Sequence, residues 1–150
     1  MVTVLVADND PGVRDLLAEV ARRQGFTVRT ADDGAAARAE LQRGGIGILV
    51  CDLDMPRVSG DQLLAWLATQ ATQPAVVVVS GYLDARVIEA LERQPCVRSI
   101  LRKPFDVLDF ARQLRALAAP EPAQPAATTS PGAGGAGAAA PRPAGDAAQA

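Results

Sequence analysis

The sequence predicts an α/β domain in which a parallel five-stranded sheet carries helices on both faces. Short apolar runs, which suit buried strands, alternate five times with segments whose apolar residues recur at helical spacing. The connections between these segments are short, as they are in compact α/β units. The chain has 150 residues, of which 49% are hydrophobic, so one domain can bury a core.

Five runs are expected to form the strands. The run 48–51 is apolar and partly β-branched, which is typical of a strand buried on both faces of a parallel sheet. The run 26–31 alternates between apolar and polar residues, which predicts a shorter and more exposed strand. In chain order, the expected strands are residues 3–7, 26–31, 48–51, 75–79 and 97–102.

A helix is expected after each strand. Asp10 and Pro11 are a strong helix start, because an acid can cap the first turn and proline suits its first position. Asp61, Asp84 and Asp106 are expected to cap the third, fourth and fifth helices. The first four helices are expected to end near glycine or proline residues, namely Gly25, Gly44, Pro74 and Pro95.

From Ala118 onward the chain contains no Leu, Ile, Val or aromatic residue. Such a segment cannot bury enough apolar surface to offset the entropy lost on ordering. The sequence therefore predicts a domain over residues 1–117 and an Ala/Pro/Gly-rich flexible tail or linker over residues 118–150.

Composition argues against several classes of function. The net charge is −2 and no basic stripe is present, so direct nucleic-acid binding is not expected. Histidine is absent, which excludes Ser–His–Asp and Cys–His catalysis and most zinc sites. No apolar run reaches membrane-spanning length and no signal-peptide pattern opens the chain, so a cytoplasmic location without membrane contact is expected. Cys51 and Cys96 are then expected to be reduced core thiols.

Polar residues with complementary chemistry follow the expected strands. Asp8, Asp52, Ser80 and Lys103 should meet at one edge, because parallel strands end at the same side of a sheet. This set suggests phosphoryl transfer to the Asp52 carboxylate, with a divalent cation such as Mg²⁺ held by oxygen atoms. The Ser80 hydroxyl and the Lys103 ammonium could bind phosphoryl oxygens.

Each of these residues also has an ordinary interpretation. Asp52 and Asp54 could be loop acids in water, and Ser80 could be a strand-end hydroxyl that bonds to backbone. For Asp10, we accept the interpretation as a simple helix cap. Lys103 is the only lysine beside fourteen arginines, which favours a need for a compact point charge over chance.

Together these residues resemble the receiver domain of two-component response regulators, over about Thr3 to Leu117. Asp52 matches the phosphoacceptor of that family, and Ser80 matches its hydroxyl position. The other matching segments are Met55-Pro56, Gly60 and Lys103-Pro104-Phe105. The resemblance implies a flavodoxin-like fold with strand order 2-1-3-4-5 and a cis Lys103–Pro104 bond.

The resemblance also implies a function. Asp52 would be phosphorylated by a histidine kinase or phosphotransfer protein, and the protein would not be an enzyme beyond catalysing its own phosphorylation and dephosphorylation at this residue. Mg²⁺ would be held by Asp8, Asn9 and Asp52 and by the backbone carbonyl of Asp54. No output domain follows in the sequence, so a stand-alone receiver is expected. It would dock to an unidentified downstream protein through the fourth helix, fifth strand and fifth helix.

Three positions depart from the family pattern. Asn9 stands where the family usually has a second acid, which predicts weakened Mg²⁺ affinity. Ile100 stands where a switch aromatic often lies, so a phosphorylation signal must use another rearrangement, for which Tyr82 is a candidate. Asp54 places an acidic side chain near the phosphoryl group and is expected to tune hydrolysis.

Two rival interpretations stay open. The first is a pseudo-receiver that binds partners without phosphorylation, which the amide at Asn9 makes plausible. The second is a haloacid-dehalogenase-like phosphatase, because Asp52-Leu53-Asp54 resembles its nucleophile motif. That family also needs an acidic pair on a strand after the lysine, whereas Asp106 and Asp109 are expected on a helix.

Overall fold

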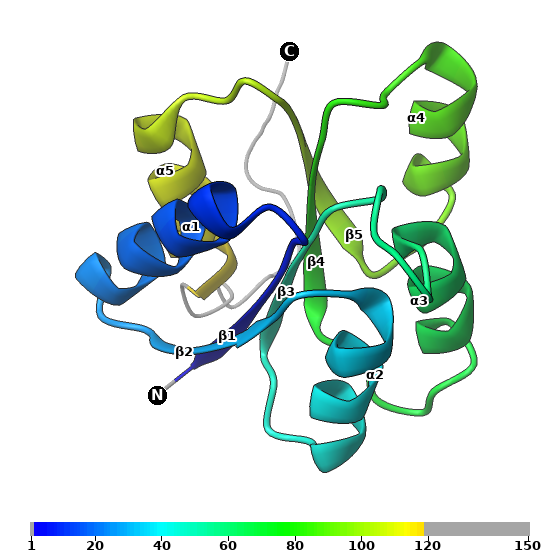
Figure 1. The fold of residues 1–150 in the computed structure, drawn as a ribbon, viewed down its shortest axis with the longest axis horizontal. Coiled ribbons are helices and arrows are strands. Elements are labelled where there is room, and N and C mark those ends of the chain that lie inside the picture. The colour runs from blue at the N-terminus through cyan, green and yellow to red at the C-terminus, as the bar shows by residue number, and fades with distance from the viewer. Residues whose placement is uncertain (1, 119–150) are drawn as a thin grey trace, which may run out of the picture. The chain divides into compact units, whose positions relative to one another are not determined.

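The computed structural model describes residues 2–118, in which strands and helices alternate (Figure 1). The elements are β1 (Thr3–Ala7), α1 (Pro11–Arg23), β2 (Thr27–Ala31), α2 (Gly34–Arg43), β3 (Ile48–Cys51), α3 (Gly60–Leu67), β4 (Ala75–Ser80), α4 (Ala85–Glu92), β5 (Val97–Arg102) and α5 (Val107–Ala118). Apart from Ala118, which ends α5, the expected tail lies outside the described residues. Within residues 2–118, no helix combines the length and the apolar character that crossing a membrane requires.

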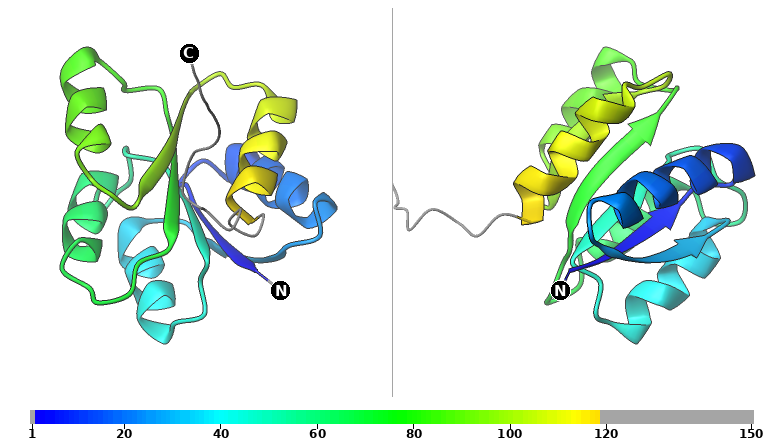
Figure 2. Two further views of the ribbon diagram at one scale, coloured as in Figure 1. Left: turned by 180° about the vertical axis from the view of Figure 1, so that it is seen from behind. Right: turned by 90° about the vertical axis from the view of Figure 1, so that its left-hand side faces the viewer.

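The five strands form one parallel sheet in the order β2-β1-β3-β4-β5. This order confirms the predicted fold class and the flavodoxin-like topology. Helices α1 and α5 cover one face of the sheet, and α2, α3 and α4 cover the other (Figures 1 and 2). Since all strands run the same way, their carboxyl ends share one edge.

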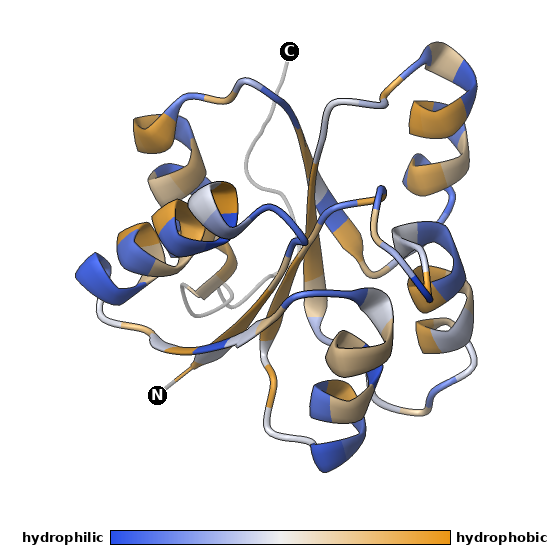
Figure 3. Cartoon of the chain, in the orientation of Figure 1, coloured by the Kyte–Doolittle hydropathy of each residue, from blue (hydrophilic) through white to orange (hydrophobic). Residues whose placement is uncertain are grey.

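Each face of the sheet packs its own hydrophobic core. Successive side chains of a strand point to opposite faces, so β3 sends Leu49 and Cys51 to one core and Val50 to the other. The first core adds residues of α2, α3 and α4, and the second adds residues of α1 and α5, including the fully buried Phe110. Figure 3 shows β1, β3 and β4 mainly in the hydrophobic colour, whereas β2, β5 and the helices carry both colours. This pattern is the one expected of strands covered on both sides.

The strand boundaries agree with the prediction except at β2, which begins at Thr27 rather than Phe26, and at β4, which continues to Ser80 rather than ending at Val79. The backbone N–H of Phe26 donates to Ala21 of α1, and the N–H of Gly25 donates to Arg22. These two hydrogen bonds, with Gly25 at φ 94°, form the end of α1. The backbone N–H of Phe26 therefore bonds to the helix and not to the sheet.

Acidic caps begin several helices as predicted. Asp10, Asp84 and Asp106 each accept hydrogen bonds from backbone N–H groups of the following turn. The prediction of Asp61 as the cap of α3 is wrong. Ser59 caps this helix and shares a reciprocal pair of hydrogen bonds with Gln62, while Asp61 lies in the first turn. A serine followed three residues later by glutamine satisfies two backbone donors at once, which a cap at Asp61 would not do.

We expect Ser59→Ala to lower the free energy of unfolding by about 1 kcal/mol, because one end of the capping pair is removed. Asp61→Ala is the matched comparison and should cost less, since Asp61 contributes only its charge near the helix start. Urea denaturation of both variants measures the difference. A larger loss for Asp61→Ala would show that Asp61, and not Ser59, caps α3.

Candidate functional site

Strand ends place four polar residues at one edge of the sheet. Asp8 follows β1, Asp52 follows β3, Ser80 ends β4 and Lys103 follows β5. Backbone hydrogen bonds to neighbouring strands continue through these positions, for example from Asp52 N–H to the Ala7 carbonyl at 3.0 Å. The backbone of each residue is therefore fixed by the sheet and not by a mobile loop.

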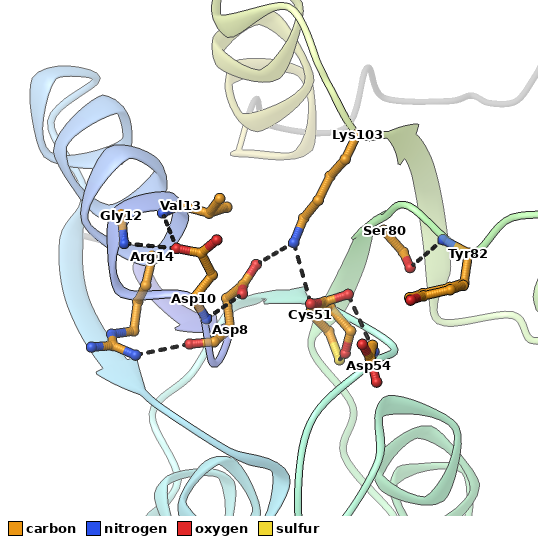
Figure 4. A network of polar contacts seen from close by, with 11 residues as sticks. Asp8, Asp10, Gly12, Val13, Arg14, Cys51, Asp54, Ser80, Tyr82 and Lys103 are labelled. Carbon is orange, nitrogen blue, oxygen red and sulfur yellow. Dashed lines mark hydrogen bonds and ion pairs between the residues drawn. The ribbon is translucent and has the colours of Figure 1, made fainter.

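Lys103 connects the two buried acids. Its Nζ lies 2.9 Å from Asp8 Oδ2 and 3.2 Å from Asp52 Oδ2, and Figure 4 shows the side chain reaching toward Asp8. The side chains of Asp8 and Asp52 are only 1% and 6% exposed, whereas that of Lys103 is 23% exposed. Charge-assisted hydrogen bonds of this kind are strong, and they offset the cost of burying the carboxylates.

Backbone donors hold the other carboxylate oxygens. Asp8 Oδ1 accepts from the N–H of Asp10 at 2.9 Å, and Asp52 Oδ1 accepts from the N–H of Asp54 at 3.2 Å. Each donor lies two residues after its acceptor, as in a local side-chain turn. Both acids are thus oriented from two sides before any ligand binds.

The charges of this cluster do not balance. Burial by itself lowers the pKa of Lys103, but the hydrogen bonds and negative charges of Asp8 and Asp52 outweigh it. The pKa of Lys103 is therefore raised above its ordinary value, and the ammonium form persists at neutral pH. With both acids ionised, one ammonium against two carboxylates leaves one negative charge, which favours a cation nearby.

An open pocket of about 280 Å³ lies beside Asp52. Its lining residues are Asn9, Asp10, Asp52, Asp54, Gly81, Tyr82 and Lys103. Of the residues predicted to hold a metal, Asn9, Asp52 and Asp54 reach this pocket, whereas Asp8 is fully buried.

The oxygen atoms at the pocket are of the type that binds Mg²⁺, but few of them carry a negative charge. Carboxylate, amide and carbonyl oxygens are the hard ligands that this ion takes, usually with several waters. Within residues 2–118, however, no group of three acids, cysteines or histidines is arranged to hold a metal ion. Asn9, which is exposed at the pocket, supplies an amide where a third charged ligand would fit.

The position of Ser80 fits both interpretations given above, a hydroxyl that bonds to backbone and a hydroxyl beside the candidate site. Its side chain is buried, and its Oγ accepts a hydrogen bond from the N–H of Tyr82 at 3.1 Å (Figure 4). This is the backbone contact of an ordinary strand-end hydroxyl. Because Gly81 and Tyr82 line the pocket, it also places Ser80 next to the pocket wall.

Tyr82, which is 69% exposed, lines the pocket. The sequence analysis had not predicted this residue as part of the site. Its distance of two residues from Ser80 is the only sequence signal for this position. Ile100 is half-buried and packs against the core beneath α2, α3 and α4. The Lys103–Pro104 bond is cis, as the resemblance implied.

Cys51 precedes Asp52 and is completely buried. Its Sγ donates to the Asp52 carbonyl at 3.2 Å. Burial and the neighbouring charges of Asp52, Asp61 and Asp8 raise the pKa of the Cys51 thiol far above its ordinary value. The thiol is therefore neutral, as expected for a core cysteine.

Comparisons with known proteins agree with the resemblance to receiver domains. The family model of the response regulator receiver domain matches residues 4–115. The chain is 26% identical over 117 residues to the sensory transduction protein RegX3 of Mycobacterium tuberculosis, covering 78% of this chain and 51% of RegX3. It is 33% identical over 104 residues to the transcriptional regulatory protein GlrR of Escherichia coli, covering 69% of this chain and 23% of GlrR. The chain thus spans about half, or less, of the length of these relatives.

A solved structure agrees with these matches. The response regulator receiver protein from Pseudomonas putida superimposes with a TM-score of 0.72 at 26% identity, covering 77% of this chain and 96% of that one. Receiver domains are signalling domains that interact with histidine kinases or phosphotransfer proteins and generally bind Mg²⁺ at an acidic pocket. The chain belongs to the family of response regulator receiver domains.

Proposed function

We propose that this protein is a phosphorylation-dependent switch in two-component signalling, with Asp52 as the phosphoacceptor. A histidine kinase or phosphotransfer protein would donate the phosphoryl group, and the modification would change the affinity for a partner protein. The observation that carries the proposal is the position of Lys103, whose Nζ lies 3.2 Å from a buried but pocket-lining carboxylate.

The proposed reaction moves the phosphoryl group from a histidine nitrogen to a carboxylate oxygen. An oxygen of Asp52 forms the new bond to phosphorus, while the bond between phosphorus and the donor imidazole breaks and the imidazole takes up a proton. Lys103 would donate to a phosphoryl oxygen and so offset the negative charge that accumulates near Asp8 and Asp52, the two acids that its Nζ contacts. Ser80 is proposed as a second donor, through its hydroxyl.

Mg²⁺ is proposed as the cofactor, held by Asp8, Asn9, Asp52 and the backbone carbonyl of Asp54. When bound, the ion supplies positive charge that neutralises phosphoryl oxygens. The amide of Asn9 carries no charge, so the affinity for Mg²⁺ should be lower than with a carboxylate at this position.

The face formed by α4, β5 and α5 is proposed to bind the downstream partner, in the cytoplasm. Leu108 of α5 is 71% exposed. A large apolar side chain in water at this point suits a surface that a partner covers.

A pseudo-receiver that acts without phosphorylation is the second candidate, because Asn9 removes one charge from the pocket. A haloacid-dehalogenase-like phosphatase has less support. Asp106 caps α5 and Asp109 lies in its first turn, so this acidic pair is not on a strand.

Incubation with acetyl phosphate and Mg²⁺, followed by intact mass measurement, tests the proposal. We expect a single phosphoryl adduct in the wild-type protein and none in Asp52→Asn, which removes the nucleophile but keeps its shape. An unmodified wild-type protein would favour the pseudo-receiver. Turnover of phosphate esters would favour the phosphatase.

Variants of Lys103 separate the effect of its positive charge from the effect of the shape of its donor group. We expect Lys103→Gln to slow phosphoryl uptake by about a hundredfold, the typical effect of losing one donor to a developing charge. Lys103→Arg keeps the charge but replaces a point donor with a planar fork, so an intermediate rate is expected. Equal rates for wild type and Lys103→Arg would show that net charge alone matters.

Asn9→Asp should tighten Mg²⁺ binding by roughly tenfold, because ligand charge governs the affinity of hard-cation sites. Isothermal calorimetry measures this change. Gln42→Glu, which adds the same charge at an exposed position on α2, is the control and should not alter Mg²⁺ affinity. Unchanged affinity in Asn9→Asp would remove this residue from the metal site.

A further inference from the structure

One buried charge has no part in the reaction proposed above. Among residues 2–118, the buried polar or charged residues are Asp8, Asp33, Asp52 and Ser80. Three of them belong to the strand-end site, but Asp33 follows β2 and lies at the start of α2, 2% exposed. A carboxylate is costly to bury unless it is paired, so its partners are informative.

Asp33 has two kinds of partner. Its Oδ1 accepts from the N–H of Ala36 at 2.7 Å, which caps α2. Its Oδ2 forms an ion pair with the guanidinium of Arg57, whose side chain is 68% exposed. Arg57 belongs to residues 52–59, the segment that joins β3 to α3 and begins with the phosphoacceptor. The pair therefore links the start of α2 to the segment that carries Asp52.

The backbone of Arg57 is unusual. Its φ is 66°, and within residues 2–118 it is the only residue other than glycine with a positive φ. A side chain raises the energy of this conformation, which normally persists only where surrounding contacts impose it. The ion pair with Asp33 is such a contact, and it gives a reason for arginine where the backbone alone would favour glycine.

Close contacts confine the same segment at two further points. A Cβ on Gly34 would lie 1.7 Å from the Val58 carbonyl oxygen, so the segment sits directly against the first residue of α2. A Cβ on Gly60 would lie 2.4 Å from the Asp52 carbonyl oxygen. Asp54 lies in the segment between these two contact points, Asp52 and Val58, and its N–H donates to Asp52 Oδ1.

We infer that the Asp33–Arg57 ion pair positions the segment 52–59 and thereby fixes the Asp54 backbone beside the phosphoacceptor. Asp33 and Arg57 are positioning residues, because their own contacts lie with α2 and not in the pocket. The consequence for metal binding and phosphoryl uptake rests on the proposed function. The consequence for the Asp54 amide does not, since the Asp54–Asp52 hydrogen bond exists without ligands.

A double-mutant cycle with Arg57→Gln and Asp33→Asn tests the inference. Asp33→Asn keeps an oxygen for the α2 cap but loses the charge. Each single variant should speed hydrogen exchange of the Asp54 amide and weaken Mg²⁺ binding, both by about tenfold, the low end for residues that orient metal ligands. The double variant should be no worse than either single one, because both changes break the same contact.

Two comparison variants separate positioning from stability. Arg43→Gln removes an arginine that is 66% exposed and paired with Glu40 on α2, and it should change neither readout. Arg57→Gly removes the charge but accepts the positive φ, so it should unfold at a higher urea concentration than Arg57→Gln. Exchange of the Asp54 amide should nevertheless stay faster than in the wild type.

Several results would overturn the inference. One is Asp54 exchange within twofold of wild type in Arg57→Gln, and another is an equal effect of Arg43→Gln. Additive losses in the double variant would show that Asp33 and Arg57 act separately. A wild-type protein that takes no phosphoryl group from acetyl phosphate would refute the proposed function alone, since the exchange measurements need neither phosphate nor metal.

Discussion

The site depends on one ammonium group between two buried carboxylates. Asp8 and Asp52 directly follow the neighbouring strands β1 and β3 and lie close enough for Lys103 to bond both. Without a cation, two like charges at this depth would repel each other and would lack solvation. The ammonium therefore stabilises two buried carboxyl groups side by side at the strand ends, and the parallel sheet supplies the rigid backbone that brings the three residues together.

The sequence predicts much of this arrangement because its signals are local. The apolar run 48–51 and the acid that follows it are contiguous, and Asp10, Asp84 and Asp106 each cap the helix directly after them. Once five strands are expected to be parallel, the edge that collects their carboxyl ends follows from topology. No comparable signal gives the distances from Lys103 Nζ to Asp8 and Asp52, which join residues that follow β5, β1 and β3.

Two features were not predicted from the sequence, one local and one between distant segments. Ser59 and Asp61 can each begin a helix, and the reciprocal hydrogen bonds between Ser59 and Gln62 favour Ser59. The ion pair between Asp33 and Arg57 joins positions far apart in the chain, and no periodic pattern connects them. Both features lie in the segment after β3, so the least predictable part of the fold is also the part nearest Asp52.

The buried thiol beside Asp52 has a chemical consequence. Cys51 is held in its neutral form inside the core, so it offers no thiolate to peroxide or electrophiles. The sheet therefore shields the sulfur atom next to the strand-end site from the redox conditions around the protein.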